Sequence, residues 1–192
     1  TISRARGTLA SAPNFGTIIN LIYNSSTTKV NTDVEVPVSG ILNNLTISAA
    51  AGITISTPLM VNGILNLTNG IADLGSNILT TSIVIGGNAN SFLNTNGTGL
   101  FIVKNIGAVS TLLPIGFTTY SPIIISNSGT IDDFKVNVAQ GTICNAEPTN
   151  TVNRVWTITE VVEGGSNASI GLQWSPFLEG TLFNRNNSAA VH

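Results

Sequence analysis

Few side chains in this sequence are suited to catalysis. The chain has one histidine, His192, at its last position, and one cysteine, Cys144. Nucleophilic catalysis needs a base held beside the nucleophile, so neither a Ser-His-Asp nor a Cys-His arrangement is expected. A lone cysteine also excludes an internal disulfide and a cysteine-based zinc site, and we interpret Cys144 as a buried small hydrophobic residue. The sequence therefore predicts no catalytic residues, no metal site, no cofactor and no enzymatic activity.

The carboxylates lead to the same expectation. Asp132 and Asp133 are adjacent, and neighbouring residues of a strand point to opposite faces. The two acids are therefore not predicted to act together as a general acid and base or to bind calcium. Glu160 and Glu163 do not have the spacing of metal ligands. We interpret all four as solvated residues at the edges of loops.

Aromatic residues in the second half of the chain offer a different chemistry, which is the stacking of sugar rings. Trp174, Tyr120 and Phe177, together with Trp156, would form a platform of the kind that binds sugars. Trp156 lies in a stretch where apolar and polar residues alternate, so its burial in a core is the favoured interpretation. The candidate glycan contacts are therefore Trp174, Tyr120 and Phe177.

The composition predicts the class of element that holds these residues. Charged residues make up 8% of the chain, against about 25% in an ordinary soluble domain. Asn, Ser, Thr and Gly occupy most polar positions, and these residues favour strands and turns over helices. The net charge is -2 and the seven Lys and Arg residues are scattered, so nucleic acid is not an expected partner. An all-β protein is expected.

Short apolar segments recur along the first half of the chain. Aligning Asn44-Leu-Thr46 with Asn66-Leu-Thr68 gives a self-repeat of roughly 20 residues, a period typical of stacked solenoids. Each repeat holds about three short strands separated by turn residues. This pattern predicts the coils of a parallel β-helix, in which residues such as Ile55 and Leu67 point inward and Thr54 and Asn66 point outward.

Three other interpretations of this region compete with the β-helix. Asn62-Gly63 between apolar runs is a hairpin signal, so an antiparallel meander is an alternative. A leucine-rich repeat is less favoured because nothing after Ile47 predicts the helix that it requires. The stretch from Val36 to Ala72 has no charge, but Pro, Asn and Gly interrupt it too often for a membrane-spanning helix, so no membrane insertion is expected.

The length and the regularity of the predicted strands change near Gly97. Beyond it the predicted strands are longer and alternate more regularly, as in a β-sandwich. We therefore predict two modules: a short parallel β-helix-like solenoid over residues 1–95, and an antiparallel β-sandwich over residues 96–192. The segments Thr17–Tyr23 and Val34–Val38 are expected to form earlier coils or an N-terminal cap.

The chain contains the following short pieces in order: Leu21–Ser25, Glu35-Val-Pro37, Leu42–Ile47, Ala51–Ile55, Val61–Gly70, Leu74–Asn77, Leu113–Gly116, Tyr120–Ile123, Val152–Ile158, Gly165–Asn167, Leu172–Trp174 and Phe183–Arg185. In this order they resemble the repeat modules of very large secreted, adhesin-like surface proteins of Bacteroidetes, and the resemblance covers nearly the whole chain. The resemblance implies an extracellular location at the cell surface and export by the type IX system. It implies no catalytic residues.

These observations favour a non-catalytic adhesin or structural module, which builds length and mediates surface or cell adhesion, as part of a longer polypeptide or as a filament subunit. The expected partners are neighbouring modules or identical subunits joined end to end, because open strand edges recruit further strands. A carbohydrate-binding module with surface glycans as partners is the main alternative. An ice-binding solenoid is less favoured, because the outward positions mix Thr with Asn irregularly.

Overall fold

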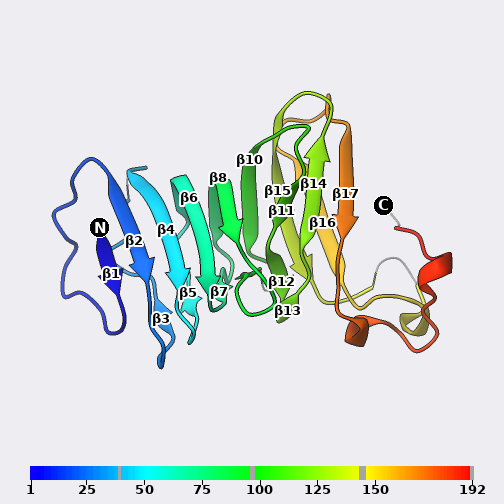
Figure 1. The fold of residues 1–192 in the computed structure, drawn as a ribbon, viewed down its shortest axis with the longest axis horizontal. Coiled ribbons are helices and arrows are strands. Elements are labelled where there is room, and N and C mark those ends of the chain that lie inside the picture. Colours follow the sequence, from blue (N-terminus) through cyan, green and yellow to red (C-terminus); the bar gives the residue numbers. More distant parts are fainter. Residues whose placement is uncertain (39, 96–97, 143–145, 191–192) are drawn as a thin grey trace.

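The protein is elongated and almost entirely made of strands. The computed structural model describes residues 1–38, 40–95, 98–142 and 146–190. Figure 1 shows the strands in a row, from β1 (Ile2–Arg4) at one end to β17 (Ala168–Leu172) near the other. Helical structure in these ranges consists of the short 3-10 turns η1 (Pro148–Asn150), η2 (Pro176–Leu178) and η3 (Arg185–Asn187). Among the described residues, no helix is long and apolar enough to cross a membrane. The prediction of an all-β protein is confirmed.

The largest sheet, sheet A, extends along the row of strands. Its eight strands have the order β1-β2-β4-β6-β8-β10-β15-β16. Every neighbouring pair from β1 to β10 is parallel. After β1, the strands of sheet A are β2 (Ile19–Tyr23), β4 (Leu42–Ser48), β6 (Leu59–Asn69), β8 (Ile78–Gly86), β10 (Leu100–Ile106), β15 (Asp132–Ala139) and β16 (Val155–Glu160).

A second sheet, sheet B, forms the return side of each coil. Its six strands have the order β13-β12-β9-β7-β5-β3, and the pairs from β3 to β12 are parallel. The chain alternates between a long strand in sheet A and a short one in sheet B, which builds a β-solenoid of about 5 turns. The strands of sheet B are β3 (Val30–Asn31), β5 (Ile53–Thr54), β7 (Ala72–Asp73), β9 (Leu93–Asn94), β12 (Ile115–Phe117) and β13 (Thr119–Tyr120).

Apolar side chains of successive coils stack in columns inside the solenoid. The expected inward direction of Ile55 and Leu67 is confirmed, since both are buried, while Thr54 and Asn66 are partly exposed. In sheet A, one column consists of the fully buried, paired residues Leu21, Leu45 and Leu65. In sheet B, one column consists of the fully buried, paired residues Ile53, Ala72, Leu93 and Ile115. The core is therefore continuous from coil to coil.

The prediction of three short strands in each coil is wrong in one respect. The segments around Leu59–Val61 and Ile64–Leu67 belong to one long strand, β6, whose register against β8 shifts between Val61 and Ile64. The Oδ1 atom of Asn44 in the preceding coil accepts a hydrogen bond from the backbone N–H of Ile64 at 2.8 Å. This contact satisfies a backbone group at the irregularity, so the strand bends without ending.

Glycine is required at this bend by a close approach between coils. A Cβ atom added to Gly63 would lie 2.5 Å from Asn44 Oδ1 and 2.8 Å from the carbonyl oxygen of Asn43. The dipeptide Asn62-Gly63 therefore marks a bulge and not a hairpin, because β4, β6 and β8 pair in parallel. The alternative of an antiparallel meander is wrong for this region.

The pairing changes from parallel to antiparallel at β10. This strand pairs in parallel with β8 on one side and antiparallel with β15 on the other, and β15 pairs antiparallel with β16. A separate antiparallel sheet, sheet D, has the order β11 (Thr111–Leu113), β14 (Ile123–Asn127) and β17. Residue 96, the expected start of the second module, lies outside the described residues, as do Gly97, Cys144 and His192. The strands β10 and β12, beyond that position, still pair in parallel with the solenoid.

Candidate functional site

The acidic residues considered for chemistry bind backbone groups of turns. Asp132 accepts a hydrogen bond from the backbone N–H of Val162 at 3.2 Å, and Asp133 accepts one from the N–H of Asn105 at 2.8 Å. Glu160 accepts from the N–H of Gly164 at 2.7 Å. Among the described residues, no three His, Cys, Asp or Glu side chains are close enough to hold a metal ion. The role of these acids in the described structure is to hold loops.

A pocket of about 400 Å³ opens beside the start of β16, and we take it as the candidate site. Its volume lies in the range of roughly 300–1,000 Å³ that is typical of small-molecule sites. Three aromatic side chains line it: Trp156, Trp174 and Phe183. Amide and hydroxyl side chains also line it, namely Thr142, Asn150, Thr151, Asn184, Asn187 and Ser188. The rest of the lining consists of Arg154 and the small or aliphatic residues Ala146, Val152, Leu172, Ala189 and Ala190.

The three aromatic rings pack against one another at angles. The ring centroids of Trp156 and Trp174 are 5.9 Å apart with an interplanar angle of 55°, and those of Trp174 and Phe183 are 6.1 Å apart at 80°. Tilted and edge-to-face pairs are the favoured arrangements of aromatic side chains. Because the planes are tilted, the rings do not cover one another face to face, and each is only partly buried.

Hydrogen bonds fix both indole groups. Trp156 Nε1 donates to the carbonyl oxygen of Ser121 at 3.0 Å, which ties β16 to the segment between β13 and β14. Trp174 Nε1 donates to Glu179 Oε1 at 2.8 Å, and the guanidinium of Arg185 binds the same oxygen. These two hydrogen bonds hold the pKa of Glu179 below its usual value of 4.5, and the bond from Arg185 has the larger effect. The carboxylate therefore stays charged at neutral pH and keeps Trp174 in place.

Arg154 forms the inner end of the pocket and is 6% exposed. Its Nη1 atom donates to the carbonyl oxygen of Asn153 at 2.7 Å, and its Nη2 atom donates to the carbonyl oxygen of Phe117 and to Thr119 Oγ1, both at 2.8 Å. The guanidinium also lies 5.5 Å from the centroid of the Phe117 ring. Arg154 thus joins the start of β16 to the turn between β12 and β13.

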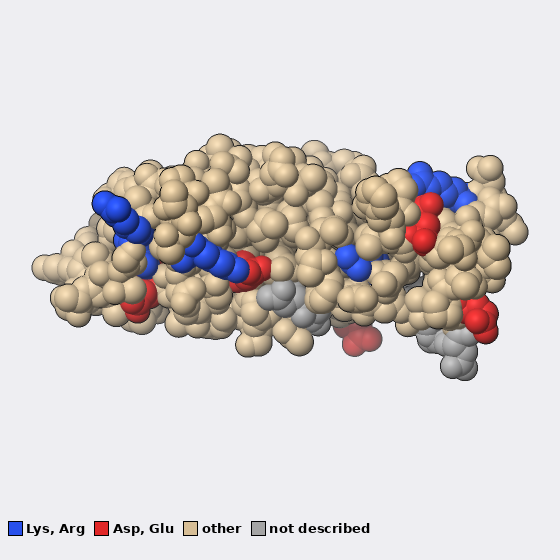
Figure 2. All heavy atoms as spheres, turned by 90° about the horizontal axis from the view of Figure 1, so that it is seen from below, with Lys and Arg blue, Asp and Glu red and all other residues tan. Residues whose placement is uncertain are grey.

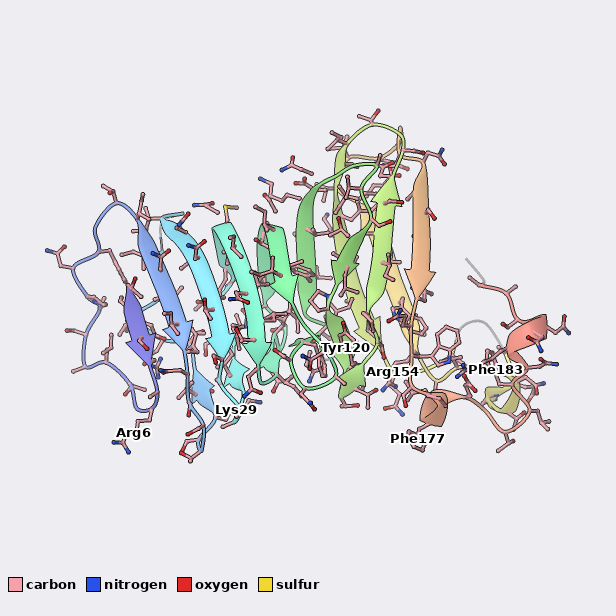
Figure 3. All side chains as sticks on the ribbon, viewed as in Figure 1. Arg6, Lys29, Tyr120, Arg154, Phe177 and Phe183 are labelled. Carbon is pink, nitrogen blue, oxygen red and sulfur yellow. The ribbon has the colours of Figure 1, made fainter. Side chains whose placement is uncertain are left out.

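The structure does not bring the three expected glycan contacts together. Trp174 lines the pocket, but Tyr120 packs against Phe92 with ring centroids 5.8 Å apart, and burial raises the pKa of its hydroxyl. Phe177 lies on η2 and is 97% exposed. Figure 3 shows Tyr120 and Phe177 apart from each other, with Phe177 on the short helix below the strands.

Two wall residues and the inner arginine were not among the sequence-predicted contacts. Trp156 was expected in a core, and its half-buried ring does pack against the core cluster while its exposed part lines the pocket. Arg154 and Phe183 lie in two of the pieces that carry the resemblance, Val152–Ile158 and Phe183–Arg185, but neither piece predicts a binding role. The pocket joins segments that are distant in sequence. Only the return of the chain after β17 brings Phe183 to Trp174.

Two other polar clusters lie in the solenoid. In an open groove on the sheet B side, Lys29 forms an ion pair with Asp73, whose other oxygen accepts a hydrogen bond from Asn94 Nδ2 at 2.6 Å. At the N-terminal end, buried Arg4 forms an ion pair with buried Glu35. Both clusters link one coil to another, and their charged groups are paired within the protein.

Comparison of the chain with protein-family models, with curated proteins and with solved structures finds no match.

Proposed function

We propose that this chain is a non-catalytic extracellular module of a cell-surface protein, which builds length and mediates adhesion to surfaces or cells. The observation that carries the proposal is sheet A, whose eight strands extend from β1 to β16 along the row seen in Figure 1. Such a solenoid adds length with each coil, because every coil contacts only its neighbours. The resemblance to repeat modules of adhesin-like surface proteins supports the location outside the cell.

The surface of the molecule supports this role. Figure 2 shows one long face on which charged side chains are few and most of the surface is neutral. The chain has only seven Lys and Arg and nine Asp and Glu residues among its 192 residues. A face of this kind provides little long-range repulsion between neighbouring molecules. Modules can therefore pack closely, side by side or end to end.

We further propose that the C-terminal strands form a β-sandwich, in which β10, β15 and β16 face sheet D. Side chains from both groups belong to one hydrophobic cluster, including Ile123 and Ile125 of β14 and Val136 and Val138 of β15. This sandwich would cover the last coil of the solenoid. It would also place the aromatic pocket at the end of the module opposite to β1.

The outer strands of this end are incompletely covered. Within the described residues β16 and β17 are the last strands of their sheets. On β16 the inward residue Ile158 is partly exposed, whereas Val136, its partner on β15, is fully buried. On β17 the inward residue Ile170 is 45% exposed, whereas Ile125, its partner on β14, is fully buried. An uncovered edge with apolar side chains accepts further strands. We therefore propose that the neighbouring module or an identical subunit joins here.

The test is the state of association of the purified chain. We expect sedimentation velocity to show concentration-dependent oligomers, and electron microscopy to show them joined end to end along the long axis of the module. An isolated chain that stays monomeric at high concentration, with no end-to-end contacts in micrographs, would contradict the proposed assembly and leave a self-contained module.

A further inference from the structure

We propose that the pocket formed by Trp156, Trp174 and Phe183 binds a neutral saccharide. The inference rests on the proposed function for its biological meaning, since the saccharide would be the target of adhesion. It adds a binding site and a class of ligand, and its aromatic residues share only Trp174 with the three glycan contacts expected from the sequence. The pocket combines ring faces, uncharged polar groups and a fixed geometry, and each of these features points to the same ligand.

The aromatic wall suits the apolar face of a sugar ring. A pyranose presents C–H groups on one face, and aromatic faces attract such groups while burying apolar surface. The tilt of 55° between Trp156 and Trp174 and of 80° between Trp174 and Phe183 makes the wall curved. A curved aromatic wall fits a compact ring better than a flat extended chain.

The polar part of the lining suits hydroxyl groups. Asn150, Asn184 and Asn187 supply amide groups, and Thr142, Thr151 and Ser188 supply hydroxyls. Each of these groups both donates and accepts hydrogen bonds. Asn184 Oδ1 already accepts a hydrogen bond from the backbone N–H of Asn186, and Ser188 Oγ donates one to the carbonyl oxygen of Arg185. A ligand with many hydroxyl groups can use in turn the donors and acceptors that such contacts leave.

The charged side chains near the pocket already make hydrogen bonds within the protein, which favours a neutral ligand over an acidic one. Among the described residues, Arg154 has no carboxylate partner and its buried Nε atom makes no hydrogen bond. Both terminal nitrogens of Arg154 donate to protein oxygens, at 2.7 Å and 2.8 Å. Arg185 forms an ion pair with Glu179 at 2.6 Å. An anionic group would have to compete with these contacts for its binding energy. A neutral saccharide needs none of them to change.

The pocket is largely preformed. Each indole is held by a hydrogen bond from its ring nitrogen, at 3.0 Å to Ser121 and 2.8 Å to Glu179. Rigid aromatic groups lose little conformational freedom on binding, which reduces the entropic cost of association. We therefore expect binding without rearrangement of the strands.

Tryptophan fluorescence gives a direct test, because the two tryptophans of the chain both line this pocket. The full chain is titrated with neutral saccharides, namely glucose, galactose, mannose, N-acetylglucosamine, cellobiose, lactose and chitobiose, and with sialyllactose as an acidic probe. We expect a saturable change in emission for at least one neutral saccharide, with a Kd below about 1 mM, and a heat of binding with the same Kd by calorimetry.

Variants assign the binding to the pocket. Trp174→Ala should weaken it at least about tenfold, a change of about 1.4 kcal/mol. Phe177→Ala, which removes an exposed aromatic ring outside the pocket, should bind as the original chain does. Asn150→Ala and Asn187→Ala change exposed residues of the lining and should also weaken binding, while the melting temperature stays unchanged.

Three results would overturn the inference: no saturable change with any neutral saccharide, tighter binding of sialyllactose than of lactose, or full binding by both asparagine variants. The outcome is separate from that of the assembly test. A chain that binds the sugar as a monomer would support the pocket and contradict the assembly, and a chain that assembles without binding any sugar would do the reverse.

Discussion

At the scale of single residues, the buried ion pair of Arg4 and Glu35 is the main specific contact of the N-terminal end. Tyr23 donates a hydrogen bond to Glu35 Oε1 at 2.6 Å, and the backbone N–H of Asp33 donates to the same atom at 3.1 Å. Arg4 also donates to the carbonyl oxygen of Asn31 at 2.8 Å. The segment Val34–Val38, expected as a coil or cap, contains no strand and carries Glu35 into this cluster. The cluster ties β1 to the first coil.

The ion pair predicts how stability depends on pH. Burial raises the pKa of Glu35, but the hydrogen bonds from Tyr23, Asp33 and Arg4 outweigh it and hold the pKa below its usual value of 4.5. A lowered pKa in the folded state means that the unfolded chain binds the proton more tightly. The contribution of Glu35 is therefore present above about pH 4.5 and is lost as the pH falls through the folded-state value.

The matched variant is Glu35→Gln, which removes the charge and leaves Arg4 buried without its ion pair. Loss of one partner of a buried pair costs about 3–5 kcal/mol, so we expect a fall of that size in the free energy of unfolding at pH 7. Urea unfolding followed by circular dichroism between pH 7 and pH 2 measures it. The difference between the two proteins should shrink at acid pH, and a constant difference would contradict the assignment.

At the scale of elements, the stacking of side chains from successive coils holds the coils together. This stacking sets how closely the backbones of neighbouring coils approach. Gly70 follows β6 and has a φ of +86°, and a Cβ atom added to it would lie 1.6 Å from the carbonyl oxygen of Ala49 in the preceding coil. Gly75 has a φ of +59°, but an added Cβ would meet nothing within 4 Å. The two glycines share a left-handed backbone and differ in their contact with the preceding coil.

This contrast isolates the contact between coils. Both Gly70→Ala and Gly75→Ala add strain from the positive φ, but only Gly70→Ala also forces two coils apart. We expect Gly75→Ala to cost about 1 kcal/mol and Gly70→Ala to cost at least about 2 kcal/mol more. Thermal and urea unfolding of both variants measures the difference. Equal losses of stability would show that the close approach at Ala49 is readily relieved.

At the scale of the whole molecule, strand direction bears on how copies join. Because β15 is antiparallel to both β10 and β16, β16 runs in the same direction as the solenoid strands that include β1. Joining β16 of one copy to β1 of the next would therefore continue sheet A with another parallel pair. Contacts between two different surfaces do not close on themselves unless a rotation brings them round, so they generate filaments.

The other uncovered edge at this end of the module is β17 of sheet D, and an inward-facing charge on it should also hinder the joining of copies. Ile170→Lys places an ammonium group at the uncovered inward position of β17, and charges at such positions prevent the addition of strands. Leu182→Lys adds the same charge at a residue that is 70% exposed outside any strand. We expect sedimentation velocity to show monomers for Ile170→Lys and unchanged oligomers for Leu182→Lys. Equal dissociation of both would point to net charge and not to the edge.

The pattern of residue types was enough to predict the class of the fold and which side chains of the coils point inward. The alternation through Ile53-Thr54-Ile55 and the repeat of Asn44-Leu-Thr46 at Asn66-Leu-Thr68 indicated inward and outward positions, because side chains alternate along any strand. The same local pattern could not predict that two of the expected strands join into β6. That outcome depends on Asn44 in the preceding coil, which satisfies the backbone of Ile64.

The pairing of strands and the composition of the pocket depend on tertiary packing. A sequence pattern does not distinguish Asn62-Gly63 in a hairpin from the same pair in a bulge. In a hairpin the segments on either side of the pair would bond to each other, whereas here both segments bond to the strands of neighbouring coils. Trp156, Trp174 and Phe183 meet because β16 and the chain after β17 return to the same end of the molecule. Tyr120 and Phe177 have the same chemistry but lie elsewhere. The sequence shows the type of each residue, but which residues meet in space depends on the packing of segments far apart in the chain.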